Sequence, residues 1–152
     1  MNQNKIGILI KRASLEVEKK ALAILAPYSM NLTQYKIIVY LYNAPPASTR
    51  QVDLERAFSM TNPSVTSVLH TLEKKGLVQR EENPEDKRSN VISLTEKAIC
   101  MQSELTAVGG QLEEAIAENL SPEERTTLIA LLKKCCKMNG MMAGSIGLEE
   151  SE

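Results

Sequence analysis

The stretch from residue 61 to residue 94 constrains the fold most, because a helix with two chemically different edges is followed there by two strand-like runs. One edge of the helix is apolar, since its hydrophobic side chains recur at steps of three and four residues. The other edge carries short hydrogen-bonding side chains, namely Asn62, Ser64, Thr66, Ser67, His70 and Thr71. Such side chains allow a helix to approach another surface closely and still exchange hydrogen bonds with it, which suits the major groove of DNA.

Ordinary capping signals mark the ends of this helix. Thr61 is expected to cap the first turn with its hydroxyl oxygen, Pro63 fits that turn, and Gly76 ends the helix. Two predicted strands follow, at residues 77–81 and 90–94, around a polar loop that contains an Asn-Pro turn signal and a basic tip. A helix followed by such a hairpin is the arrangement of a winged helix-turn-helix.

Three short motifs in this stretch resemble the signature of the MarR family, the multiple-antibiotic-resistance-type transcription regulators. They are Gly76-Leu77-Val78-x-Arg80, Asn83-Pro84-x-Asp86-Lys87-Arg88 and Leu94-Thr95-Glu96-Lys97. The order and length of the expected elements are also similar to those of the family over nearly the whole chain. The resemblance implies a mainly α fold with a small β-hairpin wing, in which a winged helix-turn-helix lobe sits on an all-helical dimerisation base.

Composition is consistent with one helical domain in the cytoplasm. The 152 residues are 43% hydrophobic but only 3% aromatic, so aliphatic side chains have to fill the core. No apolar run approaches the roughly 18 residues of a membrane helix, and the polar start is unlike a signal peptide. The three cysteines lack framework spacing and fit reduced thiols better than disulfides.

The chain is expected to form a single domain, residues 1–152, with three parts. Residues 31–94 form the winged lobe, residues 5–27 and 95–140 supply the dimerisation helices, and residues 141–152 form a flexible tail. The first amphipathic helix spans roughly 22 residues, which is longer than a small core can cover, so part of its apolar stripe is expected to meet a second subunit.

The boundaries of the other helices follow from caps and breakers. Thr33 is expected to cap the second helix, and a short helix is predicted over residues 48–57. Thr95 is expected to cap the helix after the wing, in which Gly109 and Gly110 predict a bend or a close helix crossing. A Ser-Pro-Glu-Glu capping box opens the last helix, whose expected buried residues are Leu128, Leu131, Leu132 and Cys135.

A recognition helix presents its N-terminal half to the base edges. The candidate base contacts in that half are Asn62, Pro63, Ser64, Thr66 and Ser67. The candidate contacts nearer the DNA backbone are His70, Thr71 and Lys74. The family resemblance implies base reading from Thr66 and Ser67. Neither is the arginine that most often reads guanine, so DNA shape is expected to carry much of the specificity.

The wing supplies a second set of candidate contacts. The resemblance implies that Arg88 lies in or near the minor groove, that Asp86 braces it, and that Lys87 contacts phosphates. The alternative is a turn whose charges only keep it soluble.

Charge supports DNA binding less clearly. The net charge is −1, and residues 48–94 carry seven basic and seven acidic side chains. A neutral lobe counts against DNA binding, because phosphate contacts usually dominate affinity. Helix N-termini also hold phosphates, and a dimer doubles the positive edge of each lobe. The neutral lobe therefore leaves open an alternative, a helical dimer whose winged lobe binds a protein partner.

Catalytic, metal and cofactor chemistry is not expected. His70 is the only histidine and has no neighbouring nucleophile or paired carboxylates, and no His/Cys cluster offers metal-ligand spacing. Cys100 and Cys135 lie on apolar or semi-apolar helix faces, where they are expected to be packing thiols. Cys136 follows Cys135 directly, and side chains one residue apart on a helix point in different directions. A thiol-switched regulator remains a further alternative.

The resemblance also implies a small aromatic or anionic effector that binds between the base and the lobe. Tyr28, Met30, Tyr35 and Tyr40 lie near the helices expected to line such a site, and ordinary core positions are the alternative for each. The sequence as a whole thus predicts a DNA-binding transcription regulator, a ligand-responsive repressor that binds a pseudo-palindromic operator in double-stranded DNA as a homodimer.

Overall fold

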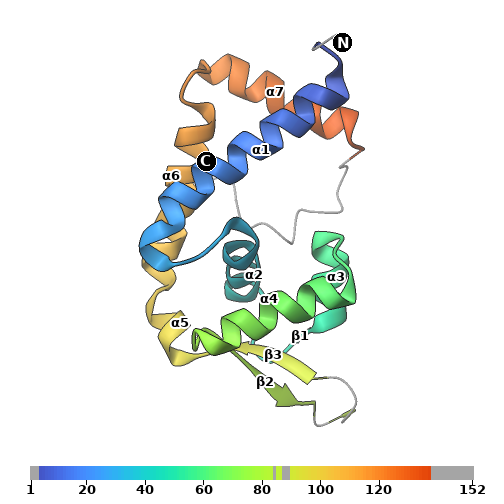
Figure 1. The fold of residues 1–152 in the computed structure, drawn as a ribbon, viewed down its shortest axis with the longest axis vertical. Coiled ribbons are helices and arrows are strands. Elements are labelled where there is room, and N and C mark those ends of the chain that lie inside the picture. The colour runs from blue at the N-terminus through green and yellow to red at the C-terminus, as the bar shows by residue number, and fades with distance from the viewer. Residues whose placement is uncertain (1–3, 84, 87–89, 138–152) are drawn as a thin grey trace.

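The computed structural model describes residues 4–83, 85–86 and 90–137. The elements of this described part are α1 (Ile6–Leu25), the 3-10 helix η1 (Ala26–Tyr28), α2 (Leu32–Asn43), β1 (Thr49–Arg50), α3 (Gln51–Phe58), α4 (Asn62–Lys74), β2 (Val78–Glu82), β3 (Asn90–Leu94), α5 (Glu96–Cys100), α6 (Gln102–Ala117) and α7 (Pro122–Cys135). Helices α1, α6 and α7 form one end of the molecule, the helices α3 and α4 with the sheet form the other, and α2 lies between them (Figure 1). No described helix is both long enough and apolar enough to cross a membrane.

The mainly helical class with a β-hairpin wing is confirmed. Strands β2 and β3 pair antiparallel, with Val78 opposite Leu94 and Glu82 opposite Asn90. In the described sheet β3 also pairs with β1, which gives the order β1-β3-β2. The helix predicted over residues 48–57 is wrong at its start, because Thr49 is buried and pairs with Ile92 of β3, so that α3 begins only at Gln51.

The cap predicted for α2 is also wrong. Asn31, not Thr33, caps this helix: its Oδ1 accepts the Gln34 backbone N–H at 2.9 Å, and its own N–H donates to Gln34 Oε1 at 3.3 Å. Both residue types favour helix starts, but only Asn31 has a Gln three residues later to complete the reciprocal pair.

The core joins the two ends of the molecule. Leu25 of α1, Ile38 of α2, Leu69 of α4 and Leu105 of α6 all have 0% exposed surface and belong to one hydrophobic cluster. The winged lobe is therefore packed against the helical end through α2, and the position of α2 couples the two.

The helix predicted after the wing is two helices. It breaks at Met101, between α5 and α6, and continues without interruption through the paired glycines. A Cβ at Gly109 would lie 2.9 Å from the hydroxyl oxygen of Tyr35, which itself donates to the Leu105 carbonyl at 3.0 Å. Of the two predicted alternatives, a bend or a close helix crossing, the close crossing is confirmed, because Gly109 makes room for Tyr35 of α2.

The last helix begins as predicted but is not covered. Ser121 accepts the Glu124 N–H at 3.1 Å and the Glu124 side chain accepts the Ser121 N–H at 2.9 Å, so the capping box is confirmed. Among the described residues α7 has no buried side chain. The expected burial of Leu128, Leu131, Leu132 and Cys135 is wrong for the single chain, because the three leucines are 38–58% exposed and Cys135 is exposed.

Candidate nucleic-acid interface and effector cavity

Helix α4 is held by its inner edge and leaves its outer edge open. Val65, Leu69 and Leu72 have 0% exposed surface, while Val68 is half-buried. Thr61 caps the helix, because its hydroxyl oxygen accepts the Ser64 N–H at 3.4 Å and its hydroxyl donates to Ser64 Oγ at 2.8 Å. The predicted helix start, apolar edge and Gly76 end, with a φ of +70°, are confirmed.

The outer edge of α4 is exposed and forms one side of a shallow hollow. The residues that line it are Asn62, Pro63, Thr66, Ser67, His70, Glu73 and Arg80. The first five are candidate DNA contacts from the sequence, so the fold gathers these five on one surface. Ser64 and Lys74 are also exposed, but the half-buried Thr71 donates its hydroxyl to the Ser67 carbonyl at 3.2 Å.

Sequence reasoning did not place Glu73 and Arg80 on this surface. Arg80, from β2, donates through Nε to the Glu73 carboxylate of α4, and both side chains are about one-third exposed (28% and 33%). The ion pair offsets a negative charge that would otherwise face phosphates. Glu73 lies three residues after His70, so helical periodicity alone could have placed it on this edge.

A third residue absent from the sequence-based set is Gln51, at the first position of α3. Its side-chain Nε2 donates to Thr66 Oγ1 at 2.7 Å and to the Asn62 carbonyl oxygen at 3.3 Å. Gln51 therefore links the first helix of the helix-turn-helix to the N-terminal half of the second. The sequence shows no signal for this contact, because its partners lie 11 and 15 positions away.

Only part of the wing tip is described. Asn83 Oδ1 accepts the Glu85 N–H at 3.0 Å, which closes the turn after β2, and Asp86 is exposed. Lys87 and Arg88 lie outside the described residues, so their assigned roles at phosphates and the minor groove remain predictions. The described side chains at this end of the hairpin are acidic: Glu81, Glu82 and Glu85 are all exposed.

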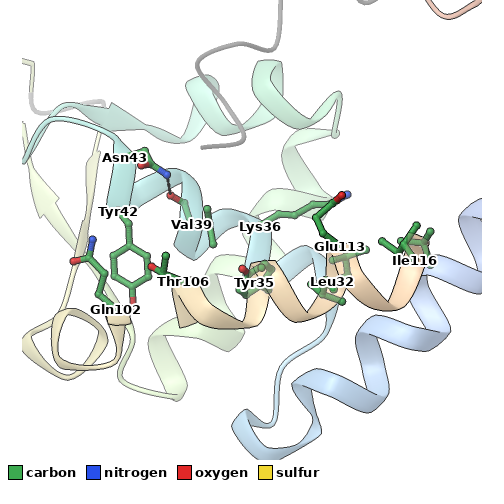
Figure 2. A pocket seen from close by; sticks show the side chains of 13 residues that line it. Leu32, Tyr35, Lys36, Val39, Tyr42, Asn43, Gln102, Thr106, Glu113 and Ile116 are labelled. Atoms are coloured by element: carbon green, nitrogen blue, oxygen red, sulfur yellow. Dashed lines mark hydrogen bonds between the residues drawn. The ribbon is translucent and has the colours of Figure 1, made fainter. Parts of the chain in front are cut away.

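A cavity of about 330 Å³ lies between the helical end and α2. Its described lining consists of Val17, Leu32, Tyr35, Lys36, Val39, Tyr42, Asn43, Gln102, Thr106, Gly109, Leu112, Glu113 and Ile116. Lys36 and Glu113 extend toward one end of it, and Tyr42, Gln102 and Thr106 gather at the other (Figure 2).

Two tyrosines line this cavity, and their hydroxyl groups are bound to backbone carbonyl oxygens. Burial raises the pKa of Tyr42 to about 12, with a smaller contribution from neighbouring Tyr35, and burial also raises the pKa of Tyr35. Both phenols therefore stay protonated at neutral pH and donate to backbone carbonyl oxygens, Tyr42 to Ala98 of α5 and Tyr35 to Leu105 of α6.

Of the four predicted effector residues, only Tyr35 is in the described lining. Met30 is buried in the core and Tyr28 is half-buried against it. Tyr40 lies on another side of α2, where its ring packs edge-on against Phe58 at a centroid distance of 5.9 Å. Side chains three and four apart share a helix face, so Leu32 and Val39, rather than Tyr40, accompany Tyr35 into the cavity.

The cysteines do not pack as predicted. Cys100, Cys135 and Cys136 are all exposed and free in the described chain. Among the described residues no group of three His, Cys, Asp or Glu side chains could hold a metal ion.

A three-helix lobe with an antiparallel wing and an open polar edge on its last helix defines the winged helix-turn-helix class of protein. Comparisons with known proteins specify the family. The MarR family model matches residues 30–90. The reduced form of MarR from E. coli is 30% identical to this chain, with a TM-score of 0.75, and the match covers 86% of this chain and 96% of that one. The chain therefore belongs to the MarR family of transcription regulators.

Two similar structures contain DNA. MepR of S. aureus in complex with DNA is 28% identical, with a TM-score of 0.80, and the match covers 88% of this chain and 98% of that one. A mutant of E. coli MarR complexed with operator DNA is 29% identical, with a TM-score of 0.78, and the match covers 86% of this chain and 92% of that one.

Proposed function

We propose that this chain is a DNA-binding transcriptional repressor that acts as a homodimer in the cytoplasm and responds to a small effector, without catalytic activity of its own. The observation that carries the proposal is the two-sided character of α4. Val65, Leu69 and Leu72 of its inner edge are completely buried, and its outer edge exposes hydroxyl and amide groups that fit base and phosphate acceptors. Two similar family members have structures in complex with DNA, which supports DNA binding by this chain.

Exposed apolar residues support the dimer. Helix α1 exposes Ile6, Leu9, Leu15 and Leu22 by 47–68%, and α7 exposes Leu128, Ile129, Leu131 and Leu132 by 38–58%. The two helices lie at the same end of the molecule (Figure 1). Residues 1–47 carry six bases and two acids, whereas residues 95–152 carry five and ten, so the two segments attract each other. A second copy that covers these faces would bring two recognition helices to successive major grooves.

The cavity supports effector binding. Its volume of about 330 Å³ is that of a small-molecule site, and its walls come from α1 and α6 of the helical end and from α2. Lys36 favours a carboxylate, and the apolar wall of Leu32, Val39 and Leu112 favours a ring. A ligand there shifts the equilibrium between lobe positions only if it prefers one of them. Benzoate should lower DNA affinity through this site, and Lys36→Met should abolish its effect. A benzoate response that survives Lys36→Met would contradict the assignment.

Selection of duplexes from a random pool is the direct test of DNA binding. The full-length protein should enrich sequences with two-fold symmetry. Arg88→Ala should weaken binding to the enriched duplex about 10-fold at low salt without changing the thermal unfolding midpoint, because minor-groove arginines act through the local negative potential. Unchanged affinity of Arg88→Ala would remove the wing from the interface.

Two alternatives have their own supporting observations. The neutral charge of residues 48–94 favours a lobe that binds a protein partner. In that case neither random nor enriched DNA would be retarded in a shift assay. The three exposed thiols favour a thiol-switched regulator. Replacing all three cysteines by serine without changing the response of DNA binding to peroxide would exclude that alternative.

A further inference from the structure

The hydrogen bonds of Gln51 determine what the Thr66 hydroxyl can read. A carbonyl oxygen only accepts hydrogen bonds, so the contact with the Asn62 carbonyl at 3.3 Å identifies the Gln51 atom as the amide nitrogen. The same nitrogen lies 2.7 Å from Thr66 Oγ1, so Thr66 accepts there. The proton of the Thr66 hydroxyl is therefore not used in this contact.

Three other helical threonines use their hydroxyl protons differently. Thr71, Thr126 and Thr127 each donate to the carbonyl four residues earlier, at distances of 2.9–3.2 Å. This back-bonding is a common choice of a helical threonine, and it leaves the hydroxyl oxygen able only to accept from a partner outside the helix. Thr66 makes no such bond among the described residues.

The carbonyl that Thr66 would use is that of Asn62, four residues earlier, and Gln51 already donates to it. A helix carbonyl has two acceptor sites, and the helical N–H four residues on takes one of them. Gln51 takes the other. The side chain of Gln51 thus occupies the Asn62 carbonyl and also donates to the Thr66 hydroxyl oxygen. Because the proton of the Thr66 hydroxyl then has no acceptor within the helix, it points outward from the exposed edge of α4.

We infer that Gln51 is a positioning residue that makes Thr66 a hydrogen-bond donor to an acceptor on a base edge in the major groove. The acceptors available there are N7 and O6 of guanine, N7 of adenine and O4 of thymine. The inference rests on the proposed DNA-binding function. It adds that the Thr66 hydroxyl distinguishes between bases at one base pair in each half-site. Without Gln51, Thr66 would donate to Asn62 and present only acceptor lone pairs to the DNA.

The test compares three full-length variants on a duplex enriched by the parent protein and on its single-base-pair changes. Gln51→Met keeps the length of the side chain and removes its donor. Thr66→Val keeps the shape and removes the hydroxyl, and Gln111→Met changes an exposed glutamine of α6 as the matched control. Both lobe variants should lose about five-fold discrimination at the same base pair, as expected for one hydrogen bond. Preferences at other positions and the salt dependence should stay those of the parent, and Gln111→Met should behave as the parent throughout.

The double variant separates positioning from direct contact. If Gln51 acts through Thr66, Gln51→Met/Thr66→Val should lose no more discrimination than Thr66→Val alone. Additive losses would mean that Gln51 contacts DNA itself, and unchanged preferences in Gln51→Met would mean that Thr66 donates without its help; either result overturns the inference. A uniform loss at all positions with a lower unfolding midpoint would reduce Gln51 to a structural role. Failure of the parent to enrich any sequence would instead remove the proposed function, and the inference with it.

Discussion

Helices α4 and α7 have similar lengths, 13 and 14 residues, and similar apolar stripes, but the described chain covers only one of them. Val65, Leu69 and Leu72 of the α4 stripe have 0% exposed surface, whereas the leucines and the isoleucine of α7 are 38–58% exposed. Both helices start with a hydroxyl cap and Pro in the first turn. Local sequence therefore specifies where each helix begins and which face is apolar, but the partner of that face depends on the rest of the assembly.

The difference divides the molecule by function. The lobe that reads DNA is packed within one chain, so its surface can be complete before assembly. In the proposed homodimer, another copy covers the apolar faces of the helical end, so assembly would set the spacing between two lobes. The cavity lies between the helical end and α2, so the proposed effector would act on their relative position.

Charging the uncovered stripe should have the largest effect on DNA binding. Leu128→Asp with Leu131→Asp should leave the lobe folded but prevent dimerisation, because buried carboxylates without partners are costly. Loss of the second half-site should lower affinity for an enriched duplex about 10²–10⁴-fold. Sedimentation and DNA titration measure the two effects.

The matched control places the same charges on the other side of α7, as Thr126→Asp with Ala130→Asp. At 100° per residue these positions lie opposite the stripe. This variant should remain dimeric and bind DNA like the parent. A monomeric control, or a dimeric Leu128/Leu131 variant, would contradict the assignment of the dimer face.

Truncating one leucine in each region tests the contrast directly. Leu69→Ala removes a side chain with 0% exposure and should lower the free energy of unfolding by about 2–5 kcal/mol. Leu131 is 58% exposed in the single chain, so Leu131→Ala should change the unfolding of dissociated protein by no more than about 0.5 kcal/mol. Urea denaturation at low protein concentration provides both values. Equal losses would mean that the chain covers α7 by itself.

The same contrast explains what the sequence could predict. The cap, apolar edge and end of α4 depend on neighbours a few residues away, and the wing pairs two strands across a single turn, so each was predictable. Two of the wrong predictions depend on distant contacts. Strand β1 is two residues long and exists only through its pairing with β3, and the burial of the α7 stripe needs a surface that the described chain does not contain.

The candidate site divides in the same way. The exposed polar residues of α4 follow from helical periodicity, which also places Glu73 on the same edge. Gln51 and Arg80 come from other elements, and only the fold shows that they touch α4. The lining of the cavity was harder to predict from the sequence. The four candidate residues were chosen because they lie in or near α2, but this does not show which face of the helix each one occupies, and only Tyr35 lines the cavity.

The junction between the two parts should show its own pH dependence. Tyr42 donates to the Ala98 carbonyl, and burial raises its pKa to about 12, above the ordinary value of 10.0. A raised folded-state pKa stabilises the fold below the unfolded pKa, and this contribution is lost as pH rises through the folded value. The parent should therefore lose stability between pH 10 and pH 12, and Tyr42→Phe should lack this part of the slope. Parallel curves of unfolding free energy against pH would contradict the role of Tyr42.

The helix caps give the smallest and most closely matched comparison. Thr61→Ala should cost about 1 kcal/mol of unfolding free energy at any protein concentration, because α4 belongs to the core of one chain. Ser121→Ala removes an equivalent cap from α7, where it should weaken the dimer by a similar amount, about 1 kcal/mol, and hardly affect dissociated protein. The two variants should therefore differ in concentration dependence rather than in size. Denaturation at several protein concentrations measures this, and a concentration-independent loss in Ser121→Ala would show that α7 stabilises the single chain, which would remove the distinction between the two regions.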